Sequence, residues 1–223
     1  MLNSPRSFWT TSEAGHREGY VVEQRGRAAR RAELISATRR VAGRSGLTRT
    51  NVRAVAAEAS VSTGSVLYYF PTFDDLMYAT VEGVLEEMYE KRRMIAESEP
   101  DPAKRLVALI VAGVPDEISD HLRMAYESIP LLREQPEYRP LHRSIVERQV
   151  ALFRSTIEIG AAIGVFRPTA DLTMIARNIV ALEDAYDLYP LIGLEHGAAT
   201  YRANILSYAR TALACELDLQ ASP

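Results

Sequence analysis

The sequence lacks the features that mark secreted and membrane-spanning proteins. It has a single cysteine, Cys215, so an internal disulfide is excluded, as expected for a reducing compartment. Its longest apolar run, residues 106–115, is well short of the ~18 residues that span a bilayer. The first 25 residues have no apolar signal-peptide core. These absences predict a soluble, cytoplasmic protein without contact to a membrane.

The sequence also has few of the residues and motifs that carry metal or enzyme chemistry. Its four histidines, at positions 16, 121, 142 and 196, show no metal-ligand spacing among themselves or with Cys215. No GxSxG, Walker-type or GxGxxG pattern is present. We therefore expect no metal, no cofactor and no catalytic residue. The hydrophobic share of 47% is sufficient for a folded core and argues against a disordered chain.

Charge is unevenly distributed along the chain. Residues 1–72 contain eleven arginines and five glutamates, a net charge of +6, so the remainder carries −9 of the total of −3. A basic front and an acidic rear suggest two domains with different partners, the front one polyanionic, although chance could produce the same split. We predict a flexible arm at 1–25, a small domain at 26–72 and a larger one at 73–223.

Proline positions and apolar spacing indicate helices. No proline occurs between Arg6 and Phe70, and apolar residues recur at spacings of three and four, whereas alternation of period two is scarce. This predicts an all-α chain of about nine helices. One helix is expected from about residue 27 to 44 and two short ones at 51–59 and 63–70. Six more are expected at 73–98, 103–113, 116–132, 137–164, 169–189 and 196–218, forming a C-terminal helical bundle.

The two short helices follow each other closely. Thr50 can cap the first, and Ser62 can cap the second after a break at residues 60–62. The second helix is expected to turn Val66, Leu67 and Phe70 inward. Two short helices joined by a tight turn around a buried apolar plug form the helix-turn-helix pattern. A helical hairpin inside a larger bundle is the alternative.

The outward face of the second short helix has the chemistry of a DNA contact. Its first residues are small, which allows the backbone to approach base edges, and its hydroxyls can bond bases or phosphates. Two arginines near the preceding helix are placed for the sugar-phosphate backbone. The predicted DNA-binding residues are Arg49, Thr50, Arg53, Ser62, Thr63, Gly64, Ser65, Tyr68 and Tyr69.

The run VSTGSVLYYFP at 61–71, followed by DDL at 74–76, resembles the TetR family of transcriptional regulators. Residues 31–38, 46–48, 164–168 and 182–184 are also similar to that family. Three positions depart from it: Ser60 replaces a usual glycine, Leu67 replaces an aromatic residue, and Phe73 replaces a frequent lysine. Ser60 therefore has to tolerate a left-handed backbone.

The resemblance implies a homodimer that binds a palindromic operator in double-stranded DNA. Residues 26–72 would be a three-helix DNA-binding domain, and residues 73–223 would bind a small-molecule effector and dimerise. Effector binding would move the fourth helix and release the operator, as in a repressor. A transcriptional activator of the same family is the alternative.

The resemblance also leads to candidates for the effector pocket and the dimer seam. Pocket candidates combine flat apolar surface with hydrogen-bonding groups: Tyr89, Tyr126, Phe153, Met174 and Asn178. Seam candidates form apolar stripes on the last two helices: Leu172, Ile175, Ile179, Leu182, Tyr186, Tyr201, Ile205, Tyr208 and Ala212. For both sets the alternative is the chain's own core.

Glu183, Asp184 and Asp187 form an acidic cluster on the helix expected at 169–189. A solvated helix face is the preferred interpretation, ahead of a general base or a site for a cationic ligand. Two other functions remain as alternatives to a DNA-binding regulator. One is a small helical enzyme that uses the C-terminal cavity, and the other is a helical scaffold that dimerises without binding DNA.

Overall fold

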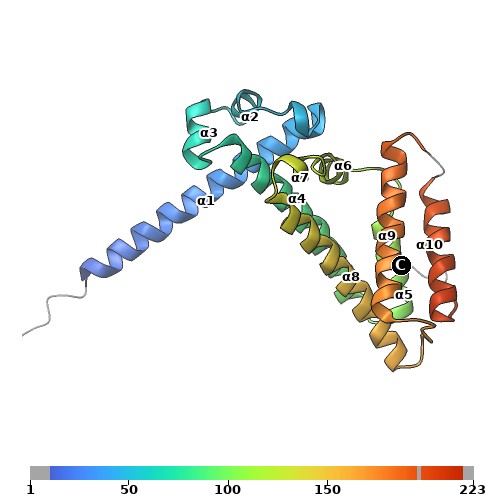
Figure 1. The fold of residues 1–223 in the computed structure, drawn as a ribbon. Helices are drawn as coiled ribbons and strands as arrows, with labels where there is room; N and C mark the ends of the chain where they lie inside the picture. The colour runs from blue at the N-terminus through green and yellow to red at the C-terminus, as the bar shows by residue number, and fades with distance from the viewer. Residues whose placement is uncertain (1–10, 195–196, 218–223) are drawn as a thin grey trace, which may run out of the picture. The chain divides into compact units, whose positions relative to one another are not determined.

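The fold was obtained as a computed structural model that describes residues 11–194 and 197–217, with side chains from residue 24 onward (Figure 1). These residues form ten α-helices and one short 3-10 helix, and no strand occurs among them. The predicted all-α class is confirmed. The chain divides into two compact units, Met1–Thr80 and Val81–Pro223, with the boundary inside helix α4 (Phe73–Ser98).

The first helix is longer than expected. Helix α1 spans Thr11–Ser45, so residues 11–25 of the predicted flexible arm are helical, and residues 1–10 lie outside the described part. With no proline between residues 6 and 70, nothing in the backbone stops the helix from extending toward the N-terminus.

Three short elements complete the N-terminal unit before α4. They are η1 (Leu47–Arg49), α2 (Val52–Glu58) and α3 (Thr63–Tyr69). Leu34 of α1, Val55 of α2 and Val66 of α3 are buried together in one apolar cluster, which also contains Phe70 and Leu76. Each short helix thus packs one apolar side inward and leaves the other side free.

The C-terminal unit contains the rest of α4 and six further helices. Their bounds are α5 (Pro102–Gly113), α6 (Asp120–Glu127), α7 (Leu131–Glu134), α8 (Tyr138–Ala162), α9 (Leu172–Leu191) and α10 (Ala198–Leu213). The helix predicted at 116–132 is two helices, because Ser119 caps α6 and Pro130 begins a separate turn. The total therefore exceeds the nine helices expected.

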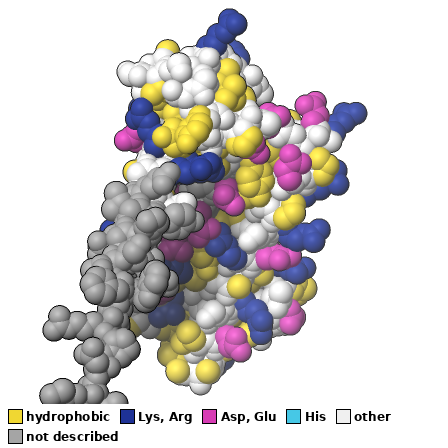
Figure 2. All heavy atoms as spheres, turned by 90° about the vertical axis from the view of Figure 1, so that its left-hand side faces the viewer, with side chains coloured by type: hydrophobic (Ala, Val, Ile, Leu, Met, Phe, Trp, Pro, Cys, Tyr) yellow, Lys and Arg dark blue, Asp and Glu magenta, His cyan; other side chains and the backbone are white. Residues whose placement is uncertain are grey.

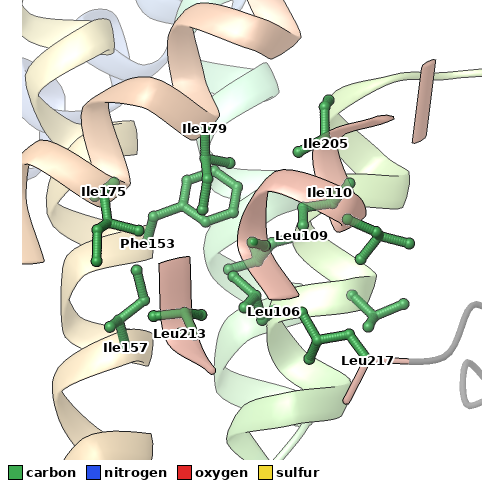
Figure 3. Packing of buried hydrophobic residues seen from close by; sticks show 14 of the residues in the cluster. Leu106, Leu109, Ile110, Phe153, Ile157, Ile175, Ile179, Ile205, Leu213 and Leu217 are labelled. Carbon is green, nitrogen blue, oxygen red and sulfur yellow. The ribbon is translucent and has the colours of Figure 1, made fainter. Parts of the chain in front are cut away.

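The core of this unit lies around α5 (Figure 3). Leu106, Leu109 and Ile110 on one side of α5 are fully buried. They pack with side chains from the other helices of the unit: Phe153, Ile157, Ile175, Ile179, Ile205 and Leu213. A central helix surrounded by others explains why the segment at 106–115 is apolar on nearly every side.

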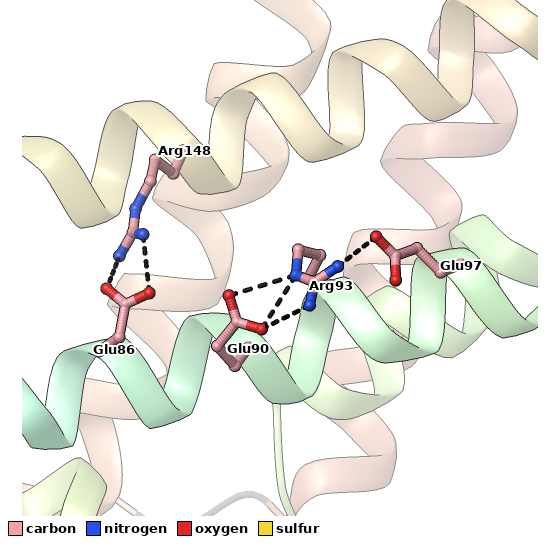
Figure 4. A network of polar contacts seen from close by, with 5 residues as sticks. All are labelled: Glu86, Glu90, Arg93, Glu97 and Arg148. Atoms are coloured by element: carbon pink, nitrogen blue, oxygen red, sulfur yellow. Dashed lines mark hydrogen bonds and ion pairs between the residues drawn. The ribbon is translucent and has the colours of Figure 1, made fainter. Parts of the chain in front are cut away.

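Ion pairs connect α4 with α8 on the surface of the same unit (Figure 4). Arg148 of α8 donates two hydrogen bonds to the Glu86 carboxylate of α4, at 3.1 and 2.7 Å. Arg93 lies between Glu90 and Glu97 on α4 and bonds both. Basic and acidic side chains are interspersed in the lower half of the face drawn in Figure 2. The acidic surplus of the C-terminal residues is therefore not gathered into one patch on this face.

Candidate functional site

The turn between α2 and α3 is fixed by local hydrogen bonds and one left-handed residue. Ser62 caps α3 as predicted, its Oγ accepting a hydrogen bond from the Ser65 N–H at 3.0 Å. Ser60 has φ 54°, the left-handed conformation predicted for this position. The caps and this turn hold the N-terminal end of α3 out toward solvent.

The exposed face of α3 contains most of the residues predicted to contact DNA. Ser62, Thr63 and Gly64 are exposed at its N-terminal end, and Ser65 is half-buried. Tyr68 is 69% exposed, although it lies between the buried residues Val66 and Phe70. The helix therefore presents a row of small and hydroxyl-bearing residues while its opposite side anchors it in the core.

Aromatic and basic groups gather at the other end of α3. The rings of Tyr68 and the half-buried Tyr69 meet edge to face, with centroids 5.0 Å apart. The Arg27 guanidinium of α1 lies 5.9 Å from the centre of the Tyr68 ring. Arg31 lies 3.9 Å over the Phe70 ring and also donates to the Tyr69 carbonyl. Helix α1 thus adds positive charge beside the exposed aromatic residue.

Two predictions about these helices are wrong. Thr50 does not cap α2; the cap is Asn51, whose Oδ1 accepts a hydrogen bond from the Ala54 N–H at 3.1 Å. Thr50 is buried and its Oγ donates to the Gly46 carbonyl at 2.9 Å, so it is unavailable to DNA. Leu67 is 43% exposed instead of buried, because it lies on the same side of α3 as Thr63 and Tyr68.

The arginines of the N-terminal unit differ in how they are held. Arg49 and Arg53 are exposed beside α2, and the Arg49 Nε donates to the Ser45 carbonyl at 2.7 Å. Arg40 and Arg44 both bond Glu58, and these hydrogen bonds hold the pKa of that carboxyl below its usual range. Glu58, the one acidic residue of α2, is therefore neutralised within the unit.

A buried ion pair is the main polar feature of the C-terminal unit. The Arg92 Nη1 of α4 donates to the Glu183 Oε2 of α9 at 2.8 Å. Glu183 is 1% exposed and Asp187, one turn further along α9, is 5% exposed. The preferred interpretation of the acidic cluster as a solvated face is therefore wrong for both residues. Gly113 of α5 leaves the space for Glu183, since a Cβ atom there would overlap the carboxylate.

The two buried carboxyls are short of hydrogen-bond donors. Among the described residues, neither Glu183 Oε1 nor Asp187 Oδ1 has a hydrogen-bond partner. Burial raises the pKa of Glu183 to about 7, with Arg92 acting in the opposite direction. Burial, and secondarily the charge of Glu183, raise the pKa of Asp187 to about 8. Asp187 therefore holds its proton at neutral pH unless a cation comes to lie beside it.

Asp187 lies on the wall of a cavity of about 200 Å³ between α4, α6, α8 and α9. Polar groups from four helices meet in it: Arg92, Tyr126, Gln149 and Asp187. The remaining wall includes His142, Asp184 and seven apolar side chains, namely Leu85, Met88, Leu122, Ala125, Ile129, Ile145 and Val146. A mostly apolar hollow with a few convergent polar groups is the usual form of a small-molecule site.

One of the five predicted pocket residues lines this cavity. It is Tyr126, whose hydroxyl donates to the Asp184 carbonyl at 2.8 Å. The other four lie elsewhere: Tyr89 under the Arg148 guanidinium, Phe153 in the core, Met174 on the surface, and Asn178 bonded to the Tyr208 hydroxyl. The sequence reasoning missed Arg92, Gln149 and the role of Asp187, because these residues meet only through long-range packing.

All nine residues predicted for the dimer seam pack in the chain's own core. Five of them are buried in the cluster around α5: Ile175, Ile179, Tyr201, Ile205 and Ala212. The other four are half-buried against that cluster: Leu172, Leu182, Tyr186 and Tyr208. Because these five side chains are buried within the chain, they offer little surface to a partner.

Metal and membrane features were sought in the part of the chain that the structure describes. No group of three or more His, Cys, Asp or Glu side chains there is arranged to hold a metal ion. Nor does this part contain a helix with the length and apolar character needed to cross a bilayer. Cys215 is half-buried, and burial raises the pKa of its thiol, which disfavours a reactive thiolate.

The helix-turn-helix also matches a known family. Residues 34–80 fit the family described as bacterial regulatory proteins, tetR family, and this range contains α2, α3 and most of the buried cluster around them. Over these residues the chain is similar to the TetR family. The resemblance inferred from residues 61–76 is confirmed.

The curated relatives that this chain matches are named as transcriptional regulators. It is 40% identical over 92 residues to the HTH-type transcriptional regulator BetI of Burkholderia cenocepacia (strain HI2424), a match covering 40% of this chain and 47% of BetI. It is 39% identical over 90 residues to BetI of Paraburkholderia xenovorans (strain LB400), covering 39% and 45%. The chain thus spans less than half the length of these relatives.

Solved structures share the fold over most of the chain. A TetR transcription regulator from Haloarcula marismortui matches with a TM-score of 0.77 and 23% identity, over 83% of this chain and 99% of the other. A putative transcriptional regulator from Saccharomonospora viridis, in complex with choline, matches with a TM-score of 0.75 and 20% identity, over 83% and 98%. At such identities the likeness concerns the fold.

Proposed function

We propose that this protein is a ligand-responsive DNA-binding transcriptional regulator of the TetR family, with α3 as its recognition helix. The observation that carries the proposal is the exposed face of α3, in which Thr63, Gly64 and Tyr68 stand clear of a fully buried Val66. A helix held in this way can enter the major groove N-terminus first, with its hydroxyls near base edges. Arg49 and Arg53 then lie beside the phosphates.

The regulator is proposed to act as a homodimer on a palindromic operator, because a two-fold dimer matches a two-fold site. The surface proposed for dimerisation is the outer side of α8 and α9. Exposed apolar residues lie on both helices, among them Val146 and Ile159 on α8 and Met174 on α9. The oligomeric state can be checked by light scattering on Ile159→Glu and Met174→Glu variants, which should be monomeric.

A small molecule is proposed to bind in the cavity of the C-terminal unit and release the operator, as in a repressor. The convergence of Tyr126, Gln149 and Asp187 in that cavity supports this role. The structure of the Saccharomonospora viridis protein in complex with choline supports a small molecule as the ligand. A transcriptional activator would use the same sites and differ only in which state favours the operator.

The first experiment is to select bound sites from random duplexes and measure affinity by gel shift. Thr63→Ala and Tyr68→Ala should weaken operator binding about tenfold or more, since good base contacts are each worth roughly 1–3 kcal/mol. Both side chains are exposed, so the stability of the folded protein should not change. Unaltered binding by both variants would refute the assignment of α3.

A second comparison separates phosphate contacts from base contacts. Arg53→Ala should weaken binding to all duplexes alike and reduce the slope of log K against log salt by about 1. Arg154→Ala, an exposed arginine of α8 in the C-terminal unit, is the matched control and should leave the slope unchanged. Equal salt slopes for the two variants would show that Arg53 does not contact the DNA phosphates.

A further inference from the structure

An unsatisfied carboxylate oxygen marks the cavity of the C-terminal unit. Asp187 Oδ1 is buried, and no donor from the described residues bonds it. The same residue lines the cavity of about 200 Å³. Buried polar atoms are nearly always hydrogen-bonded in native proteins, so an orphaned acceptor on a cavity wall indicates a donor that arrives with a ligand.

The charges around Asp187 favour its neutral form on balance, with Arg92 acting in the opposite direction. Of the described residues that line the cavity, only Arg92 carries a permanent positive charge, and its Nη1 is bonded to Glu183. On α6, Tyr126 is a neutral phenol whose pKa is raised by burial and by Asp184. On α8, burial lowers the pKa of His142, which keeps that ring neutral at pH 7. Glu183 and Asp184 on α9 add further negative charge.

The cavity wall also limits the size and shape of the ligand. Seven of the thirteen side chains that line the cavity are apolar, including Leu85, Met88 and Ile145. A volume of about 200 Å³ is smaller than the roughly 300–1,000 Å³ of drug-sized sites. The ligand therefore combines one cationic donor group with a few carbon atoms.

We propose that this cavity binds a small protonated amine, whose N–H group donates to Asp187 Oδ1 and whose alkyl part packs against Met88 and Ile145. A quaternary ammonium ion has the charge but no N–H donor, so it would leave the acceptor unsatisfied. Carboxylic acids are disfavoured because a second anion would lie beside Glu183 and Asp187. Binding of the amine can be measured without DNA and does not depend on the proposed function. Only the role of the amine as the effector rests on that function.

Binding should displace a proton. In the free protein the Asp187 carboxyl holds its proton, since burial raises its pKa to about 8. When the ammonium group enters, the carboxyl ionises to pair with it, and the proton passes to solvent. Net, the ammonium ion and the neutral carboxyl become an ion pair plus one released proton. Titration calorimetry in buffers of different ionisation enthalpy counts this proton directly.

The test uses four probes of similar size on the full chain. Isobutylammonium should bind and raise Tm, whereas isobutanol, isobutyrate and tetramethylammonium should each bind at least about tenfold more weakly, a difference of 1.4 kcal/mol. Asp187→Asn should lose amine binding by a similar factor and release no proton. Asp120→Asn, a change at an exposed residue of α6, is the matched control and should bind as the parent does.

Three outcomes would overturn the site: isobutanol binding as tightly as the amine, tetramethylammonium doing so, or Asp187→Asn binding unchanged. Circular dichroism of the Asp187→Asn protein shows whether it is folded. The effector role is tested separately, by adding isobutylammonium to the operator complex. If the amine binds but does not release the operator, the site is supported and its regulatory role is refuted. If the protein binds no operator at all, the proposed function is refuted, and the result for amine binding is unaffected.

Discussion

Asp187→Asn is expected to stabilise the protein at neutral and higher pH. Asparagine has nearly the shape of aspartate but cannot ionise, so the substitution removes a buried charge without opening a cavity. Asp187 is 5% exposed and its Oδ1 has no partner among the described residues. Arg92, which lines the same cavity and is rich in donors, is bonded to Glu183. Little native bonding is therefore lost by the change.

The size of the effect follows from the difference in pKa between the two states. The pKa of Asp187 is about 8 in the folded chain, against an ordinary value of 3.8. Because this carboxyl holds its proton more tightly in the folded chain, its protonated form favours folding. That stabilisation is fully present below pH ~4 and is lost as pH rises through about 8. Each pH unit in this window costs at most about 1.4 kcal/mol. At pH 7 the loss is on the order of 1–4 kcal/mol, and Asp187→Asn should recover it.

The assay is urea denaturation followed by circular dichroism at pH 5, 6, 7 and 8, at one protein concentration. The stability advantage of Asp187→Asn over the parent should grow by roughly 1 kcal/mol per pH unit across this series. Asp120→Asn, on the exposed side of α6, should show no such trend. If Asp187→Asn is less stable than the parent by the same amount at every pH, Asp187 has a native partner and the reasoning fails.

Three further experiments, made with five substitutions, test the packing around the two sites. Arg92→Met should lower the free energy of unfolding by about 3–5 kcal/mol, because it leaves the buried Glu183 carboxylate without its ion-pair partner. Adding Glu183→Gln should restore most of this loss. Gly113→Ala should destabilise strongly because its Cβ would overlap the Glu183 carboxylate, whereas Gly26→Ala, with open space around it in α1, should stabilise by up to about 1 kcal/mol. Ser62→Ala should cost about 0.5–2 kcal/mol by removing the α3 cap. Urea denaturation measures all three, and a neutral result at Gly113 or Arg92 would contradict the described packing.

The helix-turn-helix could be predicted from the sequence because its determinants are local. The cap at Ser62, the left-handed Ser60 and the buried Val66 all act within a few residues of one another. Errors occurred where adjacent residues could fill the same role. Asn51, and not Thr50, caps α2, since η1 ends at Arg49 and uses Thr50 to close its own turn.

The cavity of the C-terminal unit could not be predicted in the same way. Arg92 and Glu183 are 91 residues apart in the sequence, and only the packing of α4 against α9 brings them together. A carboxylate on an amphipathic helix is normally solvated, so the cluster on α9 resembled an ordinary surface. The apolar stripes of α9 and α10 were equally ambiguous, because a core and a dimer seam require the same side chains.

The central claim is that α3 enters the DNA groove with its backbone close to the bases, and Gly64→Ala tests it most directly. Within the chain a Cβ atom at Gly64 meets only the Ser62 Oγ, at an ordinary 3.7 Å, so the folded protein accommodates it. We expect unchanged or slightly higher stability in urea and at least about tenfold weaker binding to the selected operator, which corresponds to 1.4 kcal/mol. Operator affinity equal to that of the parent would contradict the proposed role of α3.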